Sequence, residues 1–338
     1  MEETDTRIDW TAKAREHIEQ LTMPRWALGR LCDLMVEIVR IQETDSPALR
    51  PAAVVVLAGD HGIASEGVSA YPSEITGLMV ANFLRGGAAI SLLAKQHRLP
   101  LRVVDMGTAT AEVVPGALSV RLAKGTKSFL DRQAMSLETA TEAVAIGRQL
   151  LDRLAIDPGT STLLLGEMGI GNTTSSAALA ALLLDRDPAD LVGRGTLIDE
   201  ATLAKKIDVV RRAVTLHAQA REPLEVLAAV GGFELAGMVG MMLEAAERGR
   251  LLLLDGFPAS VAALVASRID PGVRDVCIAS HRSAEPGHDV VLEALGLVPV
   301  VEMRMRLGEA SGAALAWPLL ESAVMLYREM ATFDDLAQ

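Results

Sequence analysis

The stretch Thr162-Leu-Leu-Leu-Gly-Glu-Met-Gly-Ile-Gly-Asn-Thr-Thr-Ser-Ser176 decides the expected fold. Its apolar run, 163–165, predicts a short buried strand, and the three glycines that follow predict a tight turn. Asn172, Thr173 and Thr174 are residue types that cap helices, and the Ala-rich run 177–184 predicts the helix. Strand, turn and helix start together direct backbone N–H groups and a helix dipole at one point. That arrangement suits a phosphate or a carboxylate.

This glycine turn lacks the spacing of two common nucleotide-binding motifs. It contains neither G-x-G-x-x-G in the required register nor G-x-x-x-x-G-K-[ST], so it indicates neither a dinucleotide fold nor a P-loop ATPase. A turn that serves only helix–sheet packing is an equally good explanation of the glycines. Glu167 favours a binding site, because a carboxylate among exposed amides at a strand end is rarely a packing device.

The composition favours a core of small aliphatic side chains. Of the 338 residues, 50% are hydrophobic but only 3% are aromatic, so Ala, Leu and Val must fill the interior. This length suits one large α/β domain or two ordinary ones. The formal net charge of −12, without a dense Lys/Arg run, argues against a nucleic-acid partner.

The cysteines and the N-terminus indicate a cellular compartment. Cys32 and Cys277 lie far apart, which argues against a disulfide framework or a zinc knuckle and fits a reducing environment. The acidic start, Met-Glu-Glu-Thr-Asp, differs from a signal peptide. No uninterrupted apolar run reaches the roughly 18 residues of a membrane span. We therefore expect a cytoplasmic protein with no membrane contact.

Short apolar strands alternate with helices from residue 52 onward. This alternation predicts a doubly wound, mainly parallel sheet of the Rossmann-like α/β class. Glycines 237 and 240 would allow one helix, 231–247, to pack closely. The first 47 residues look helical, and the proline-punctuated connector 44–51 is the best domain boundary. Strands are expected at 54–58, 101–104, 163–165, 251–254, 276–279 and 298–305. Helices are expected at 11–22, 28–41, 72–84, 136–155, 199–219, 231–247, 260–268 and 313–330.

Acidic residues follow the expected strands, where parallel sheets bind their ligands. Five of them at one topological position predict a polar site on that edge. Capping of the next helix is the alternative explanation for one or two, Asp60 and Asp255 in particular. The five are Asp60, Asp105, Glu167, Asp255 and Glu309.

Residue patterns for metal or nucleophilic chemistry are missing. The six histidines form no H-x-H or H-E-x-x-H cluster, and there is no G-x-S-x-G motif. We therefore expect neither a metal nor a cofactor. What remains is anion binding together with an isolated carboxylate.

Three residues could supply those two functions. Lys206 and Ser283 could surround a monophosphate together with the turn amides, although a solvated helix face is the simpler explanation of Lys206. Glu309 lies in a glycine-flanked turn before an apolar helix, where burial would raise its pKa and suit it to proton abstraction. The alternative is a carboxylate that stabilises the start of that helix.

Seven motifs, spread from about residue 28 to 330, together carry a resemblance to a known family. The chain resembles the nicotinate-nucleotide:dimethylbenzimidazole phosphoribosyltransferases of cobalamin biosynthesis, in which the same motifs occur in the same order. The motifs are Gly59-Asp-His-Gly62 with Glu66-Gly67-Val68, Gly166-Glu-Met-Gly-Ile-Gly-Asn-Thr-Thr174, Lys206-Ile-Asp-Val-Val-Arg-Arg212, Val230-Gly-Gly-Phe-Glu234, Leu254-Asp-Gly-Phe257, Ser280-His-Arg-Ser-Ala-Glu285 and Met305-Arg-Leu-Gly-Glu-Ala-Ser-Gly-Ala-Ala-Leu315.

The resemblance implies a reaction in which nicotinate mononucleotide and a benzimidazole give nicotinate and an α-ribazole 5′-phosphate. It implies that Glu309 is the general base, taking a proton from one ring nitrogen while the other attacks C1′ of the ribose. It also implies a homodimer, and a small helical domain built from residues 1–50 with 313–338 beside a catalytic domain of residues 51–312. The substrate-binding residues expected on this basis are Glu167, Gly169, Gly171, Asn172, Thr173, Lys206, Asp255, Ser283, Gly308, Tyr71 and Met79.

Two departures from the family pattern bear on specificity. The usual K-P-x-G-S-L-G is here Met23-Pro-Arg-Trp-Ala-Leu-Gly29, so Trp26 replaces a glycine and should change the local backbone. A serine and a glutamine of the base pocket align with Tyr71 and Met79, and a methionine cannot replace the hydrogen bonds of glutamine. An acceptor other than a benzimidazole, such as a purine or a phenolic, is therefore one alternative. A non-catalytic nucleotide-binding homologue is the other alternative.

Overall fold

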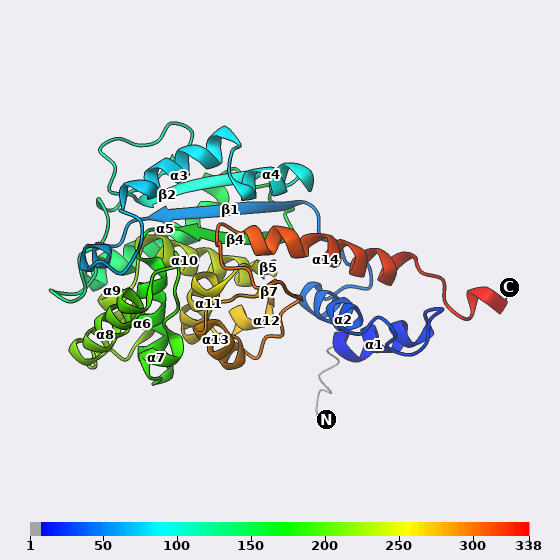
Figure 1. The fold of residues 1–338 in the computed structure, drawn as a ribbon. Helices are drawn as coiled ribbons and strands as arrows, with labels where there is room; N and C mark the ends of the chain where they lie inside the picture. The colour runs from blue at the N-terminus through cyan, green and yellow to red at the C-terminus, as the bar shows by residue number, and fades with distance from the viewer. Residues whose placement is uncertain (1–7, 338) are drawn as a thin grey trace, which may run out of the picture.

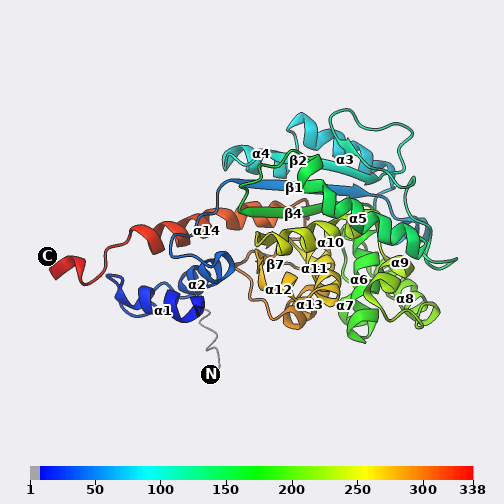
Figure 2. The ribbon, with the colours of Figure 1, turned by 180° about the vertical axis from the view of Figure 1, so that it is seen from behind.

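The computed structural model describes residues 8–337 (Figures 1 and 2). The acidic stretch at the extreme N-terminus, used above to argue against a signal peptide, lies outside these residues. The helices are α1 (Trp10–Gln20), α2 (Arg30–Gln42), α3 (Glu74–Arg85), α4 (Ala89–Gln96), α5 (Leu137–Arg153), α6 (Asn172–Leu184), α7 (Pro188–Leu191), α8 (Glu200–Leu216), α9 (Pro223–Val230), α10 (Phe233–Glu247), α11 (Phe257–Ile269), α12 (Gly272–Asp275), α13 (Gly287–Leu295) and α14 (Ser311–Glu329), with 3₁₀ turns η1 (Gly62–Glu66) and η2 (Asp335–Ala337). The strands are β1 (Ala52–Gly59), β2 (Leu101–Gly107), β3 (Leu118–Ser119), β4 (Thr162–Met168), β5 (Leu251–Leu254), β6 (Cys277–Ala279), β7 (His281–Arg282) and β8 (Val301–Glu302).

The main sheet has six parallel strands in the order β3-β2-β1-β4-β5-β6. This is the strand order of a doubly wound nucleotide-binding fold, which confirms the predicted class. The central strands β1 and β5 are buried along their whole length, as their continuous apolar sequences require. The strand order reverses between β1 and β4, so the crevice at their carboxyl ends is where such a fold binds its ligand.

Helices cover the sheet on both sides, with α3 and α4 above the strands and α10 and α11 below them in Figure 1. Below the sheet, α5 and α10 approach each other through glycines. A Cβ on Gly240 would lie 2.0 Å from the Val144 oxygen, and one on Gly147 would lie 2.1 Å from the Gly237 oxygen. The close packing predicted for the 231–247 helix is confirmed, because any side chain at these positions would push the two helices apart.

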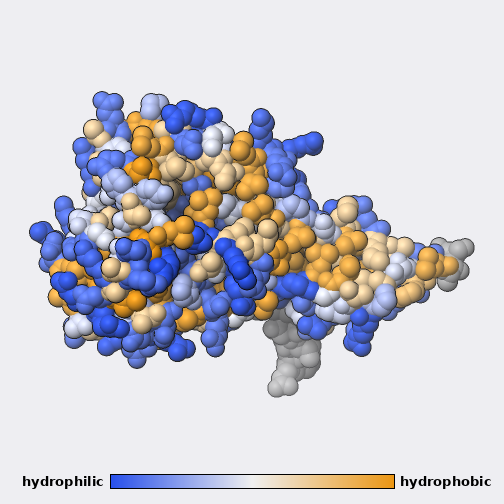
Figure 3. Space-filling view, in the orientation of Figure 1, coloured by the Kyte–Doolittle hydropathy of each residue, from blue (hydrophilic) through white to orange (hydrophobic). Residues whose placement is uncertain are grey.

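The two ends of the chain meet at one end of the molecule. Both ribbon views show α14 running from the sheet to the pair α1–α2 (Figures 1 and 2), and Leu21 forms an antiparallel bridge with Thr332. Figure 3 shows apolar surface gathered over this projecting part. The exposed apolar side chains there include Leu315, Leu319, Met325 and Phe333. Whether this part is a separate domain, 1–50 with 313–338, remains a prediction.

The expected last strand, 298–305, is wrong in length and in place. Only Val301–Glu302 form a strand, and it pairs with β7 in a separate two-stranded sheet. Pro299 has no N–H to donate to a ladder, and both Val298 and Met303 are exposed. An apolar run that is interrupted by proline and faces solvent could not become a central strand.

One stretch in the described residues, Glu74–Gln96, is long and apolar enough to meet the length and composition of a membrane span. The structure divides it into α3 and α4, and α3 ends where Gly86 takes a left-handed conformation (φ 81°). The two halves are separate short helices packed on the protein.

Candidate functional site

A cavity of about 630 Å³ opens at the carboxyl ends of β1 and β4, where the strand order reverses. All the catalytic and substrate-binding residues that the family resemblance implies line this cavity except Asp255. They come from five regions of the chain: the end of β4 with the turn and first residues of α6 that follow it, the loop before α3 with α3 itself, α8, the loop after β7 and the loop before α14. The sheet topology therefore brings together positions up to 238 residues apart, from Tyr71 to Glu309 (309 − 71 = 238).

The turn after β4 forms the floor of the cavity. Helix α6 begins at Asn172, and Gly171, in a left-handed conformation (φ 97°), is its N-cap. The prediction that residues 172–174 cap the helix is wrong, because they already belong to its first turn. The Asn172 side chain instead donates a hydrogen bond to the Glu167 carboxylate.

The Glu167 carboxyl group is completely buried at the end of β4. Burial raises its pKa well above the usual value, and the charges of Asp255, Glu234 and Glu309 raise the pKa further. A carboxyl group in this environment favours its neutral form, which can donate a hydrogen bond to a ligand.

Glu309 faces the same cavity from the loop before α14. Both Glu309 (φ 65°) and Ala310 (φ 63°) take left-handed conformations, which are costly for residues with a Cβ. The Glu309 N–H donates to the Glu167 carbonyl oxygen at 3.2 Å, which joins this loop to the end of β4. Burial and then the charge of Asp255 raise the Glu309 pKa to about 7, so the group can accept a proton near neutral pH.

Gly166 is what allows this loop to lie so close to β4. A Cβ on Gly166 would lie 2.0 Å from the Ala310 nitrogen. Gly308 has a similar role, because its φ is 86° and a Cβ there would lie 2.8 Å from Glu167 Oε1. The two glutamates are therefore held together by glycines on both of their chain segments.

Asp255 holds the start of α14 instead of lining the cavity. Its carboxylate accepts hydrogen bonds from the N–H groups of Gly312 at 2.7 Å and of Ala310 and Ala313 at 3.1 Å. Asp255 does cap a helix, as the alternative explanation predicted, but that helix is α14 and not the next one. Gly312 follows Asp255 by 57 residues (312 − 255 = 57). The next helix, α11, has Gly256 as its N-cap with no side-chain bond.

Two other acidic residues at strand ends also have structural partners. Asp60 accepts hydrogen bonds from the Thr76 hydroxyl at 2.6 Å and from the Ala109 N–H at 2.7 Å. Asp105 pairs with Arg121 at 2.6 Å. Of the five predicted acidic residues, only Glu167 and Glu309 therefore face the cavity.

The simpler explanation of Lys206, a solvated helix face, is wrong, because this lysine lines the cavity from the buried side of α8. Its side chain is buried, and Nζ donates to Thr173 Oγ1 at 2.8 Å and to the Gly193 carbonyl oxygen at 3.1 Å. Burial lowers its pKa to about 8, and the charge of Glu285 partly opposes this effect. Ser283 also lines this end. A cation, two hydroxyl groups and a helix start together suit a phosphate.

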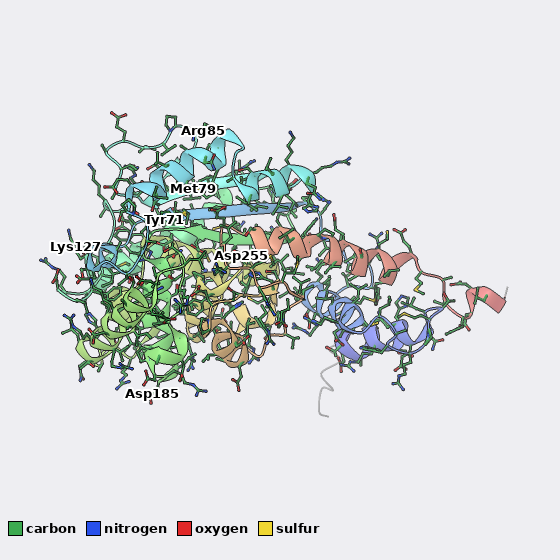
Figure 4. The ribbon with its side chains drawn as sticks, viewed as in Figure 1. Tyr71, Met79, Arg85, Lys127, Asp185 and Asp255 are labelled. Carbon is green, nitrogen blue, oxygen red and sulfur yellow. The ribbon has the colours of Figure 1, made fainter. Side chains whose placement is uncertain are left out.

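Tyr71 and Met79 line the cavity on the side of α3 (Figure 4). The Tyr71 side chain is more than half exposed, whereas Met79 is partly buried. Trp26 does not line the cavity. It has φ 56°, a conformation that glycine adopts more easily, and its ring N–H donates to Asp33 at 3.0 Å.

Sequence reasoning gave no role to a buried pair beneath the floor. His61 Nε2 and Glu234 Oε1 are 2.5 Å apart, and both side chains are fully buried. A Cβ on Gly232 would lie 2.2 Å from the His61 ring, and one on Gly171 would lie 3.0 Å from His61 Cβ. The signal was present in two of the quoted motifs, Gly59–Gly62 and Val230–Glu234, but their contact is a tertiary feature.

Fold and site together define a class of protein: a doubly wound α/β protein with a cavity suited to an anionic ligand at the switch point of its sheet. The sequence profile of a family described as "Phosphoribosyltransferase" matches residues 4–337. The chain is thus a phosphoribosyltransferase.

Individual relatives define the family more narrowly. The nicotinate-nucleotide–dimethylbenzimidazole phosphoribosyltransferases of Ralstonia nicotianae and Variovorax paradoxus are 47% and 48% identical to it, over 95% and 96% of this chain and 92% of each relative. The solved structure of the enzyme of that name from Thermus thermophilus matches with a TM-score of 0.91 and 43% identity, covering 97% of this chain and 98% of that one. A second Thermus thermophilus structure, of the protein called CobT, matches with a TM-score of 0.93 and 44% identity, covering 98% and 99%. The chain belongs to the nicotinate-nucleotide–dimethylbenzimidazole phosphoribosyltransferase family.

Proposed function

We propose that this enzyme moves the 5-phosphoribosyl group of nicotinate mononucleotide to a benzimidazole-type base, with inversion at C1′, and so supplies an α-ribazole 5′-phosphate for cobalamin assembly. The observation that carries the proposal is that one cavity is lined by both Glu309, whose pKa burial raises to about 7, and the buried Lys206. The names of the relatives support the choice of both substrates.

The chemistry balances without a further reactant. One nitrogen of the base attacks C1′ while the bond from C1′ to the pyridinium nitrogen breaks, and the bonding electrons neutralise that nitrogen. The other ring nitrogen gives its proton to the Glu309 carboxylate. Glu167, in its neutral form, can donate a hydrogen bond beside the reacting centre, and Lys206 with Thr173 and Ser283 can bind the 5′-phosphate.

We infer that the enzyme works as a homodimer in the cytoplasm. The apolar surface over α14 supports a contact with a second copy, because monomers rarely leave such patches uncovered. Tyr71, at the mouth of the cavity, is exposed enough to touch a bound base or a partner.

The direct test is nicotinate release from nicotinate mononucleotide with dimethylbenzimidazole, adenine or a phenol as acceptor. We expect release with dimethylbenzimidazole and a matching α-linked product by NMR. Met79 offers only apolar contact to the base, and an apolar pocket discriminates weakly between ligands of similar shape. The values of kcat/KM for the different acceptors should therefore differ by at most about 100-fold. Preference for adenine or the phenol would change the acceptor. Tight binding of the mononucleotide with no release for any base would support a non-catalytic homologue.

The pH profile of kcat/KM should be bell-shaped with its maximum between pH 7 and 8. Below about pH 7 Glu309 is protonated and cannot accept the proton of the base. Above about pH 8 Lys206 loses its charge and the phosphate loses its cation. Initial rates at low donor concentration between pH 5.5 and 9.5 measure both limbs, and a flat profile would contradict both roles.

A further inference from the structure

Glu285 is a buried carboxylate at the phosphate end of the cavity, between β7 and α13. Only 5% of the residue is exposed. Its Oε1 accepts a hydrogen bond from the Gly195 N–H at 3.0 Å. Its Oε2 is buried and accepts no hydrogen bond from any residue in the range 8–337 that the structure describes. A buried carboxylate oxygen without a donor is costly, so its retention at this place calls for a function.

The segment Gly193-Arg194-Gly195 connects Glu285 to Lys206. Gly193 has no side chain at a point where a Cβ would lie 2.0 Å from Glu285 Oε2. The carbonyl oxygen of the same glycine accepts the hydrogen bond from Lys206 Nζ. Gly195 takes a left-handed conformation (φ 49°), and a Cβ there would lie 3.4 Å from Lys206 Nζ. Glu285 therefore holds one end of the segment by a hydrogen bond and lies directly against the other end, whose carbonyl oxygen accepts from the lysine.

Glu285 is also the anion whose charge acts on Lys206. Its negative charge raises the lysine pKa against the larger lowering effect of burial. Several charged groups of the surrounding elements have other contacts. Arg194 pairs with Glu200, Arg211 pairs with Asp187, and Lys205 Nζ would lie 3.1 Å from a Cβ on Gly67. Arg306, His281 and Glu309 line the same cavity.

We propose that Glu285 is a positioning residue that makes the site selective for a donor carrying a 5′-phosphate, by fixing the Gly193–Gly195 segment that holds the Lys206 side chain. The proposal rests on the proposed function, because that function gives Lys206 the phosphate. Without the carboxylate, so deeply buried an amine loses its proton closer to neutrality, and the phosphate then meets a neutral group.

The test compares Glu285→Gln with wild type on two donors, nicotinate mononucleotide and nicotinate riboside, which lacks the phosphate. Glutamine keeps an acceptor for the Gly195 N–H, removes the charge and puts an amide NH2 in place of Oε2. Glu293→Gln, at an exposed position on α13, is the matched control for loss of one negative charge. We expect Glu285→Gln to raise the KM of the mononucleotide about ten-fold with little change in kcat at saturation, and to move the alkaline limb of kcat/KM to lower pH. The riboside and the control variant should show neither change.

Two results would overturn the proposal: an equal loss of kcat/KM with both donors, or an alkaline limb that stays in place. Glu285→Asp keeps the charge on a shorter side chain and serves as the second variant if the glutamine variant does not fold. It should retain the wild-type alkaline limb, and a limb that moves as far as expected for Glu285→Gln would contradict the proposal.

Failure of the proposed function is recognised separately. If the wild-type enzyme releases no nicotinate with any acceptor, calorimetry with ribose 5-phosphate and with ribose replaces the rate assay. Glu285→Gln should then weaken binding of ribose 5-phosphate alone, and equal binding of this sugar phosphate by variant and wild type would refute the role of Glu285.

Discussion

Replacing Glu309 with glutamine is expected to lower kcat about 1,000-fold, within the range that general bases contribute. The glutamine side chain has the same shape, so it can occupy the cavity wall without disturbing Ala310 or the start of α14. It cannot accept a proton at neutral pH, and the base must then attack with its N–H bond intact. Nicotinate release at saturating concentrations of both substrates measures the loss.

The same variant makes a prediction about pH that a merely structural role would not make. The acid limb of kcat/KM near pH 7 should disappear, because the group that titrates there is gone, whereas the alkaline limb assigned to Lys206 should remain. Glu302→Gln, an exposed glutamate on β8, is the matched control and should behave as wild type. A Glu309→Gln enzyme with undiminished kcat would remove Glu309 from the role of base.

The fold was predictable because its signals are local. The apolar run of β4, the glycines after it and the Ala-rich α6 follow one another within 23 residues, from Thr162 to Leu184 (184 − 162 + 1 = 23). The glycines of α10 likewise predict close packing of this helix, which the structure shows against α5. By contrast, the run 298–305 has the composition of a strand, but Val298 and Met303 face solvent and only two of its residues pair, with β7. Such pairing is a tertiary property.

The site was predictable in its position but not in the function of each residue. Sequence placed Lys206 on a helix, and only the packing of α8 against α6 and the Gly193–Gly195 segment shows that its side chain is buried. Asp255 is a carboxylate at the end of a parallel strand, where ligand-binding residues are expected, yet its partners are backbone amides at the start of α14. Contacts of such long sequence separation leave no periodic pattern in a single sequence. The motifs of the family resemblance supplied what spacing alone could not, in particular the choice of Glu309 as the base.

A second large loss of activity is expected from a substitution at Gly166, which lies beneath the loop that carries Glu309 and does not line the cavity. Gly166→Ala should lower kcat about 100-fold or more, because its new Cβ would lie 2.0 Å from the Ala310 nitrogen and 2.5 Å from the Glu309 carbonyl carbon. Both are backbone atoms, so no side chain can rotate to relieve the contact. The loop before α14 must move away from β4, and the Glu309 carboxylate moves with it. Overpacking of this kind should also lower the free energy of unfolding by about 1–3 kcal/mol.

Activity and stability can be separated by measuring urea unfolding first and then assaying nicotinate release at a temperature where the variant is fully folded. Gly272→Ala is the control, since a Cβ on this exposed glycine would meet only the Asp270 side chain, at 3.2 Å. The pH profile adds the decisive readout. If the methyl group displaces Glu309 from its buried position beside Asp255, burial and the nearby charge raise the Glu309 pKa less, and the acid limb of kcat/KM moves below pH 7. A folded Gly166→Ala enzyme with wild-type kcat and an unmoved acid limb would show that the approach of β4 to this loop does not position the base.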